Sequence, residues 1–296
     1  SGLMARRLAQ RSGVPLVFTH HTRFGDYGHY LGPLAGAVRR GLGAYLEDFW
    51  RGCAAIVAPG SELADEISAA LARRRWPLVR MIPTGVDVAA IGALPAIDVR
   101  AAHGWPADAM VVVSMGRLAK EKNLALLLEG FALAAVRDER LRFVLVGGGP
   151  AMPTAVERGQ QPDLAGRLAV TGSLPHLEAI ARVKSANLFA FASQTETQGL
   201  VLAESLAAGV PVLALAGPGV RDSVRDGEDG QVLAHEPAQP ASGARSLADA
   251  IVALADDGAR LRSMGEAAAT GAERFAIPRR IGETVALYGE VLGRTA

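Results

Sequence analysis

The stretch LFAFASQTETQGLVLAESLAAGVPVLAL, residues 188–215, combines two strands and a helix. Leu188–Phe191 is a short apolar run that predicts a buried strand, and an apolar helix begins after Gly199 and runs to Gly209. A second apolar run begins at Pro211. A strand, a helix and a strand in this order form neighbouring parallel strands joined by a crossover helix. The stretch therefore predicts a parallel sheet.

Two glutamates lie within this stretch, Glu196 before the helix and Glu204 in its second turn. The N–H groups at a helix N-terminus attract anions, so a negative ligand lying there would have a carboxylate on each side. The neighbours of Glu204 are apolar, and a buried charge needs a partner or a function. This arrangement suits a sugar nucleotide. The alternative is that Glu196 caps the helix and Glu204 lies on the surface.

The same alternation of strands and helices extends on both sides of the stretch. From residue 110 onward it predicts one doubly wound sheet, whose strands are residues 110–115, 142–146, 168–171, 188–191, 211–215 and 231–234. An earlier, shorter series predicts strands at residues 14–20, 54–59 and 79–83. We therefore predict an α/β protein with two Rossmann-like domains, residues 1–90 and 91–278. A helix at 279–296 is expected to pack back on the first domain, and residues 88–108 to connect the domains.

The bulk composition excludes several functional classes. The 296 residues carry a net charge of +1, which argues against a nucleic-acid binder that works through a broad basic field. Cys53 is the single cysteine, so neither a disulfide framework nor a cysteine-rich metal site can form within the chain. No apolar run is long enough to span a bilayer. These features favour a cytoplasmic protein.

Two loops that follow strands carry groups suited to a diphosphate. Gly116 allows the backbone to approach a ligand closely, and Arg117 and Lys122 add two permanent cations. Gly147 and Gly148 follow the next strand, where a ligand could touch the backbone. Ligands in such sheets bind outside the carboxyl ends of the strands. The alternatives are an ordinary solvated loop for the cations and a tight turn for the glycines.

A polar and aromatic loop follows the first predicted strand. The residues of interest in it are His20, His21, Arg23, Asp26 and Tyr27. Two adjacent histidines on a loop cannot easily both be core residues, although one of them could be packed in the core. A metal site would need further ligands, and no Asp-x-Asp pair occurs in the chain, so we predict no metal.

Taken together and in order, these segments resemble the family 4 glycosyltransferases, retaining enzymes of the GT-B fold, in which two Rossmann-like domains face a cleft. The matching segments are residues 20–22, 58–61, 83–87, 116–122, 146–150, 172–174 and 196–212. Family members normally begin with several further βα units, so the resemblance implies an N-terminally truncated chain whose first domain is incomplete.

The resemblance also implies a role for each site residue. Arg117 and Lys122 would hold the donor diphosphate, with the backbone N–H groups of Gly199, Leu200 and Val201. Glu196 would bind the transferred hexose and Glu204 the nucleotide ribose. The active-site histidine would be His21, while His20, Arg23, Asp26 and Tyr27 would lie on the acceptor side. The donor would be a UDP- or GDP-sugar used as substrate, with no cofactor and no metal.

Many family members have phenylalanine where Gln198 stands. The Glu-Thr-Gln-Gly version resembles members that glycosylate membrane lipids such as diacylglycerol. The implied partners are thus a nucleotide-sugar and a lipid or glycan acceptor. A peripheral contact with the inner face of the membrane is a minority hypothesis. Two alternatives stay open: a sugar-nucleotide epimerase or hydrolase on the same fold, and a nucleotide-sugar-binding module without turnover.

Overall fold

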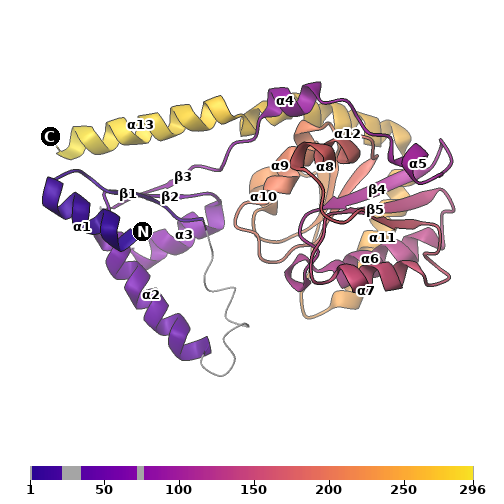
Figure 1. Ribbon diagram of the computed structural model, residues 1–296, viewed down its shortest axis with the longest axis horizontal. Coiled ribbons are helices and arrows are strands. Elements are labelled where there is room, and N and C mark those ends of the chain that lie inside the picture. The colour runs from indigo at the N-terminus through magenta and orange to yellow at the C-terminus, as the bar shows by residue number, and fades with distance from the viewer. Residues whose placement is uncertain (1, 22–34, 72–76, 296) are drawn as a thin grey trace. The chain divides into compact units, whose positions relative to one another are not determined.

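The computed structural model describes residues 2–21, 35–71 and 77–295 (Figure 1). The chain forms two compact units. Unit 1 comprises Ser1–Gly85 and Ile277–Ala296, and unit 2 comprises Val86–Ala276. The chain thus passes from unit 1 to unit 2 after Gly85 and returns after Ala276.

A six-stranded parallel sheet forms the centre of unit 2. Its strands are β4 (Met110–Met115), β5 (Leu141–Val146), β6 (Leu168–Val170), β7 (Leu188–Phe191), β8 (Val212–Leu215) and β9 (Gly230–Leu233). They lie in the order β6-β5-β4-β7-β8-β9, and every neighbouring pair is parallel. The order of the strands along the chain therefore reverses between β4 and β7, which is where ligands bind in open α/β sheets.

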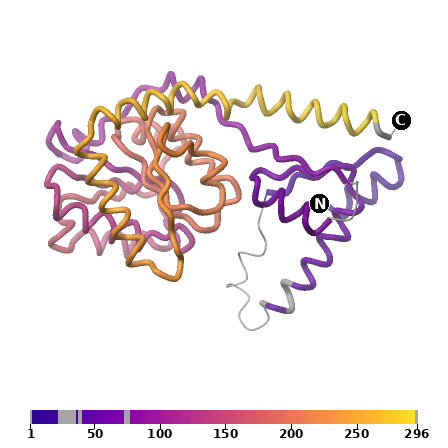
Figure 2. The backbone as a smooth tube through the Cα atoms, turned by 180° about the vertical axis from the view of Figure 1, so that it is seen from behind, coloured from indigo at the N-terminus to yellow at the C-terminus, as the bar shows by residue number. Residues whose placement is uncertain are grey.

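Helices cover both faces of this sheet, which explains why its strands are continuous apolar runs rather than alternating ones. All four residues of β7 and all four of β8 are buried. One core contains residues of α6 (Leu124–Ala135) and α11 (Pro240–Asp256), and the other contains residues of α8 (His176–Val183) and α9 (Leu200–Ala207). Figure 1 shows α8 and α9 above the strands and α6 and α7 (Met152–Gly159) below them. In Figure 2, seen from behind, α11 crosses the near side of the unit.

The structure differs from the prediction at residues 88–108, which were expected to connect the two domains. They belong to unit 2 and contain two short helices, α4 (Val88–Ala93) and α5 (Val99–Ala102). The side chain of Asp87 accepts a hydrogen bond from the amide of Ala90, and the side chain of Asp98 accepts one from the amide of Arg100. These caps start helices that are too short to show an apolar period.

Unit 2 contains four further short or C-terminal elements. They are η2 (Lys120–Lys122), α10 (Val220–Ser223), α12 (Gly258–Gly271) and η3 (Ala272–Phe275). Residues of α12 and η3 complete the core that α8 and α9 build.

Unit 1 is built on a three-stranded parallel sheet in the order β1-β2-β3. Its elements are α1 (Gly2–Ser12), β1 (Val17–Thr19), α2 (Ala35–Arg51), β2 (Ala55–Ala58), α3 (Ser61–Ala70), β3 (Leu78–Met81) and α13 (Ile277–Thr295). Phe49 and Trp50 of α2 pack with Ile56 in one core. Leu287 and Val291 of α13 pack in the other core with β2 and Leu78.

The predicted architecture, α/β with parallel sheets covered by helices, is confirmed by both units. β4 and β7 begin and end where the sequence predicts them. β1 is shorter than predicted and begins at Val17, two residues after Pro15, which has no N–H to donate to a sheet. None of the helices in the described part of the chain is both long and apolar enough to cross a membrane.

Candidate functional site

The candidate site lies at the carboxyl ends of β4, β5 and β7 in unit 2. The loop after β4 begins at Gly116, the loop after β5 begins at Gly147, and the loop after β7 leads to α9. Because β4 and β7 are adjacent in the sheet, loops that are about 80 residues apart in sequence leave it side by side. This edge is the one that the sequence predicted for ligand binding.

The first two loops approach each other too closely for any side chain. Gly116 has a φ of 142° and Gly147 a φ of 136°, and a Cβ at Gly147 would lie 2.0 Å from the carbonyl oxygen of Gly116. The amide of Gly116 donates to the carbonyl of Val146 at 2.9 Å, and the amide of Leu118 donates to the carbonyl of Gly148 at 2.9 Å. Glycine at these positions brings the two loops together as one backbone surface.

An open cavity of about 600 Å³ lies beside these loops. Seven of the predicted donor-binding residues line it, namely Gly116, Arg117, Gly147, Gly148, Leu200, Val201 and Glu204. Ser173, Leu174 and His176, which follow β6, complete part of its wall. The structure thus brings together residues that follow β4, β5 and β6 and residues of α9 around one cavity, and its size is that of a small-molecule site.

Glu204 is buried within this wall, with 8% of its surface exposed. Its Oε1 lies 3.3 Å from Nε2 of His176, whose side chain is 65% exposed. Burial raises the pKa of the Glu204 carboxyl above its usual value, and the nearby His176 opposes that shift. The carboxylate is therefore poorly solvated, faces an exposed histidine, and is available to accept hydrogen bonds from a ligand.

Lys122 and Glu196 form an ion pair through Nζ and Oε1. The loops that carry them are tied together, because the hydroxyl of Ser193 donates to the carbonyl of Glu121 at 3.3 Å. Both side chains are partly buried, Lys122 with 31% and Glu196 with 16% exposed. The pair holds one cation and one carboxylate at fixed positions between β4 and β7.

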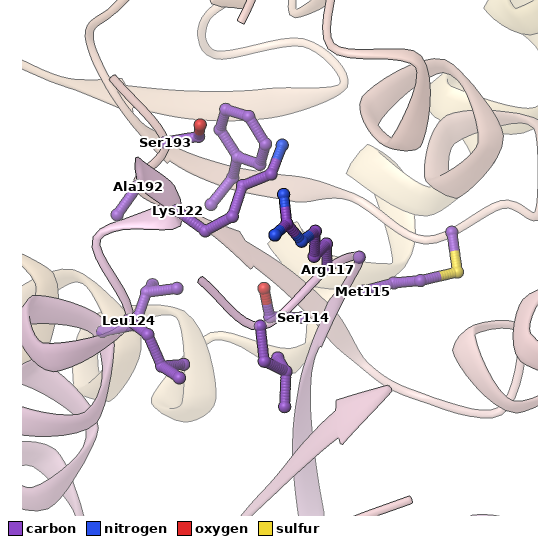
Figure 3. Close-up of a pocket in the computed structure, with 11 residues that line it drawn as sticks. Ser114, Met115, Arg117, Lys122, Leu124, Ala192 and Ser193 are labelled. Carbon is purple, nitrogen blue, oxygen red and sulfur yellow. The ribbon is translucent and has the colours of Figure 1, made fainter. Parts of the chain in front are cut away.

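Arg117 and Lys122 line a second, much smaller cavity (Figure 3). It shares Met115, Gly116 and Arg117 with the larger one, so the two are adjacent. Figure 3 shows the nitrogen-bearing ends of the Arg117 and Lys122 side chains directed towards the same side. The Arg117 side chain is 62% exposed and lies 3.5 Å from Glu121, a weak exposed contact that leaves the guanidinium able to reach a ligand.

The N-terminus of α9 completes the site. Gly199 precedes the helix with a φ of 73°, a left-handed conformation that glycine adopts without strain. The first amide bonded within this turn is that of Leu202, which donates to the carbonyl of Gly199 at 2.9 Å. The amides of Leu200 and Val201 belong to the group of N-terminal N–H groups that have no partner inside a helix. Anions bind favourably at such a position.

The predicted acceptor-side residues belong to unit 1, whereas the site described above is built from unit 2 alone. His20 is buried at the end of β1, and its ring packs edge-on against Phe18 and Trp50 at 5.6 and 5.5 Å between centroids. His21 is exposed. Arg23, Asp26 and Tyr27 lie outside the described residues. The acceptor-side and catalytic roles of this loop stay predictions.

Sequence reasoning missed His176 as a site residue. Its position could have identified His176, because it follows β6 at the same edge of the sheet as Gly147 and Glu204. Among the described residues, no group of three or more His, Cys, Asp or Glu side chains could hold a metal ion. Metal independence stays a prediction.

Two family models match the chain. "Glycosyl transferases group 1" matches residues 97–270, and "Glycosyltransferase Family 4" matches residues 1–90. The alpha-monoglucosyldiacylglycerol synthase of Streptococcus pneumoniae is 28% identical, over 76% of this chain and 52% of that protein. D-inositol 3-phosphate glycosyltransferase 1 of Catenulispora acidiphila is 30% identical, over 97% of this chain and 69% of that protein. The chain spans about half to two thirds of the length of these curated relatives.

Solved structures share the fold. Anabaena HepE in complex with UDP has a TM-score of 0.76 at 19% identity and covers 96% of this chain and 76% of that one. Sucrose-phosphate synthase from Thermosynechococcus elongatus has a TM-score of 0.75 at 22% identity and covers 99% of this chain and 72% of that one. Because the family model matches residues 97–270 and both units contain parallel sheets, the chain belongs to the group 1 glycosyltransferases and has the GT-B type of fold.

Proposed function

We propose that unit 2 binds a nucleotide-diphosphate sugar and that the protein transfers the hexose to an acceptor hydroxyl. The observation that carries this proposal is the buried Glu204, which lines a cavity at the β4–β7 switch point beside the Lys122–Glu196 pair. Two carboxylates match the ribose and hexose hydroxyls of such a donor, and the cations and the helix N-terminus at the same sheet edge match its diphosphate.

Each part of the donor has a candidate partner. Glu204 accepts hydrogen bonds from the ribose hydroxyls, while Arg117, Lys122 and the amides of Leu200 and Val201 hold the diphosphate. Glu196 binds hydroxyls of the hexose. The glycine-backed loops let the nucleotide approach the backbone closely.

Catalysis in this scheme comes from positioning and from charge directed at the departing diphosphate. As the bond from the anomeric carbon to the diphosphate breaks, negative charge grows on the leaving oxygen, and Arg117 and Lys122 stabilise it. The acceptor oxygen forms the new bond on the same face while its proton passes to the departing diphosphate oxygen, with retention and without a metal. His21 is the candidate catalytic histidine. The acceptor-side candidates are His20, Arg23, Asp26 and Tyr27.

The family relatives support a lipid acceptor. Besides the diacylglycerol glucoside synthase, a phosphatidyl-myo-inositol mannosyltransferase of Mycobacterium tuberculosis is 29% identical over 62% of this chain. We propose an acceptor hydroxyl on a membrane lipid such as diacylglycerol or its glycosides, reached by peripheral contact with the inner face of the membrane. The donor is a UDP- or GDP-sugar.

A donor and acceptor panel tests the proposal. The purified protein is incubated with UDP-glucose, UDP-galactose or GDP-mannose and with vesicles that contain diacylglycerol, and products are identified by mass spectrometry. We expect a glycolipid with one of the donors, loss of this product in Glu196→Ala, and chiefly weaker donor binding in Lys122→Ala.

Glu129→Ala, on the exposed surface of α6, is the control and should keep wild-type turnover. Unchanged transfer in Glu196→Ala would reject the assignment. Release of free sugar without acceptor would favour a hydrolase, and binding without any turnover a binding module.

A further inference from the structure

A network of charges centred on a buried aspartate lies outside the groups assigned to the donor. At its centre is Asp229, which is fully buried. Its Oδ2 accepts hydrogen bonds from Nε of Arg225 and from Nη2 of Arg274, both at 2.7 Å. Its Oδ1 accepts one from the backbone amide of Arg225 at 2.8 Å. Such a saturated carboxylate fixes the relative positions of the groups that donate to it.

The network extends from Arg274 to the loop that carries Glu196. Nη2 of Arg274 also donates to the carbonyl of Ser223, at 2.8 Å, and the hydroxyl of Ser223 donates to the carbonyl of Gln198, at 3.2 Å. Ser223 and Gln198 are both buried, with 4% and 9% exposed. Gln198 stands between Glu196, which is paired with Lys122, and Gly199, which directly precedes α9.

The same loop is held by direct packing. Gly219, which precedes α10, has a φ of 76°, and a Cβ there would lie 2.7 Å from the carbonyl carbon of Gln198. The loop therefore rests on α10 through a close backbone approach and through one hydroxyl. Both contacts act on the backbone at Gln198, two residues after Glu196, so both influence where Glu196 points.

At its other end the network lies beside the two places where the chain changes unit. The guanidinium of Arg274 stacks over the ring of Phe275, with Cζ 4.3 Å from the ring centroid. The carbonyl of Phe275 accepts a hydrogen bond from the amide of Val86 at 2.9 Å, and Val86 pairs with Ala276 in a parallel bridge. Val86 is the first residue of unit 2 and Ala276 is its last.

We propose that Ser223 and Arg274 are positioning residues for the donor loop at residues 195–199, and that they tie its geometry to the segments that connect the two units. This inference rests on the proposed function, because it assigns the loop to the hexose of a nucleotide-sugar. Ser223 acts through the carbonyl of Gln198, and Arg274 acts through Ser223. Neither residue touches the donor.

Hydrogen exchange in the ligand-free protein tests the positioning without reference to activity. In Ser223→Ala we expect exchange of peptides that cover residues 194–203 to become about fivefold faster, the factor that loss of about one buried hydrogen bond gives. Ser223→Thr keeps the hydroxyl and should restore slow exchange. Gly219→Ala should also speed exchange in these peptides, because it displaces the loop sterically without removing a bond. Together the variants separate loop positioning from a general loss of stability.

Ser205 provides a matched control. It is fully buried, and its hydroxyl donates to the carbonyl of Val210 at 3.1 Å in the same unit. Ser205→Ala should lower the melting temperature about as much as Ser223→Ala without selectively speeding exchange at 194–203. The proposal is overturned if Ser223→Ala leaves exchange at 194–203 unchanged, or if Ser205→Ala speeds it equally.

Calorimetry with UDP and with UDP-glucose supplies the second readout, and GDP and GDP-mannose replace them if the donor panel selects guanine. We expect Ser223→Ala to weaken binding of the nucleotide-sugar about fivefold and binding of the free nucleotide less than twofold, because Glu196 contacts the hexose alone. Equal weakening of both ligands would overturn the assignment of the loop to the hexose. If the wild-type protein binds none of the four ligands, the proposed function fails, whereas the exchange result still decides the positioning.

Discussion

Asp229 and Glu204 are two buried carboxylates of the same unit in opposite surroundings. Asp229 is fully buried and receives hydrogen bonds from two arginines and one backbone amide. Glu204 is 8% exposed, lines an open cavity and has His176 at 3.3 Å. Burial costs both groups their water, but the protein replaces that water fully only at Asp229. A carboxylate whose hydrogen bonds are all made within the protein supports structure, whereas one left short of partners in a cavity is suited to bind a ligand.

The largest expected effect is the loss of stability in Asp229→Ala. The substitution removes the buried carboxylate that Arg225 and Arg274 share and leaves Arg225 with Glu228, so unfolding should become easier by about 3–5 kcal/mol. Chemical denaturation followed by circular dichroism measures this change. Asp249→Ala is the matched control, because Asp249 pairs with Arg137 at 2.5 Å but its side chain is 70% exposed. Its cost should stay below about 1 kcal/mol. Similar losses in the two variants would remove the contrast between Asp229 and an ordinary surface carboxylate.

Glu204→Gln should have the opposite effect on stability. The folded state raises the pKa of Glu204, mainly through burial, so the ionised carboxylate opposes folding. Below the usual pKa of a glutamate the carboxyl is protonated in both states, and wild type and variant should melt together. As pH rises through the raised pKa the wild type loses stability and the variant does not. At pH 7 to 8 the variant should melt roughly 2–4 °C higher, the shift that about 1 kcal/mol gives in a domain of this size.

The same variant should bind nucleotide about tenfold more weakly, because it replaces a charged acceptor by a neutral one at the proposed ribose contact. Thermal scans from pH 4 to pH 8 and calorimetry with the nucleotide measure the two effects. Glu157→Gln, on the exposed surface of α7, makes the same change of charge without burial and should change neither quantity. A Glu204→Gln variant that melts with the wild type at every pH would show that Glu204, like Asp229, is fully compensated.

The sequence predicts the sheet and one edge of the site because both follow from local patterns. Apolar runs locate β4 and β7, and the loops that follow them carry Arg117, Lys122 and Glu196. The Lys122–Glu196 pair itself does not follow from the sequence. Its members are 74 residues apart, and they meet because β4 and β7 are neighbours, which depends on the order of strands in the sheet.

The Asp229 network escapes sequence reasoning for a different reason. The segment from Arg225 to Asp229 is rich in charge and glycine, a composition typical of a solvated loop. The burial of Asp229 depends on Arg274, which lies 45 residues further along the chain and is brought back by α12 and η3. A local pattern cannot distinguish a charge that is exposed from one that is buried beneath later elements of the chain.

The smallest expected effect is that of His176→Ala, which tests the contrast between Glu204 and Asp229 most directly. His176 is largely exposed, so its contact with Glu204 is that of a weak, partly screened pair. His176→Ala removes the nearby charge that lowers the pKa of Glu204, so that pKa should rise above its wild-type value in a carbon-13 NMR titration of the glutamate carboxyls. Nucleotide binding should weaken by about threefold, within the range of an exposed pair. His103→Ala, directly after α5 and not among the residues that line the cavity, is the control for loss of a histidine. An unchanged pKa of Glu204 in His176→Ala would mean that the carboxylate is solvated and held by other groups, and the distinction from Asp229 would then rest on exposure alone.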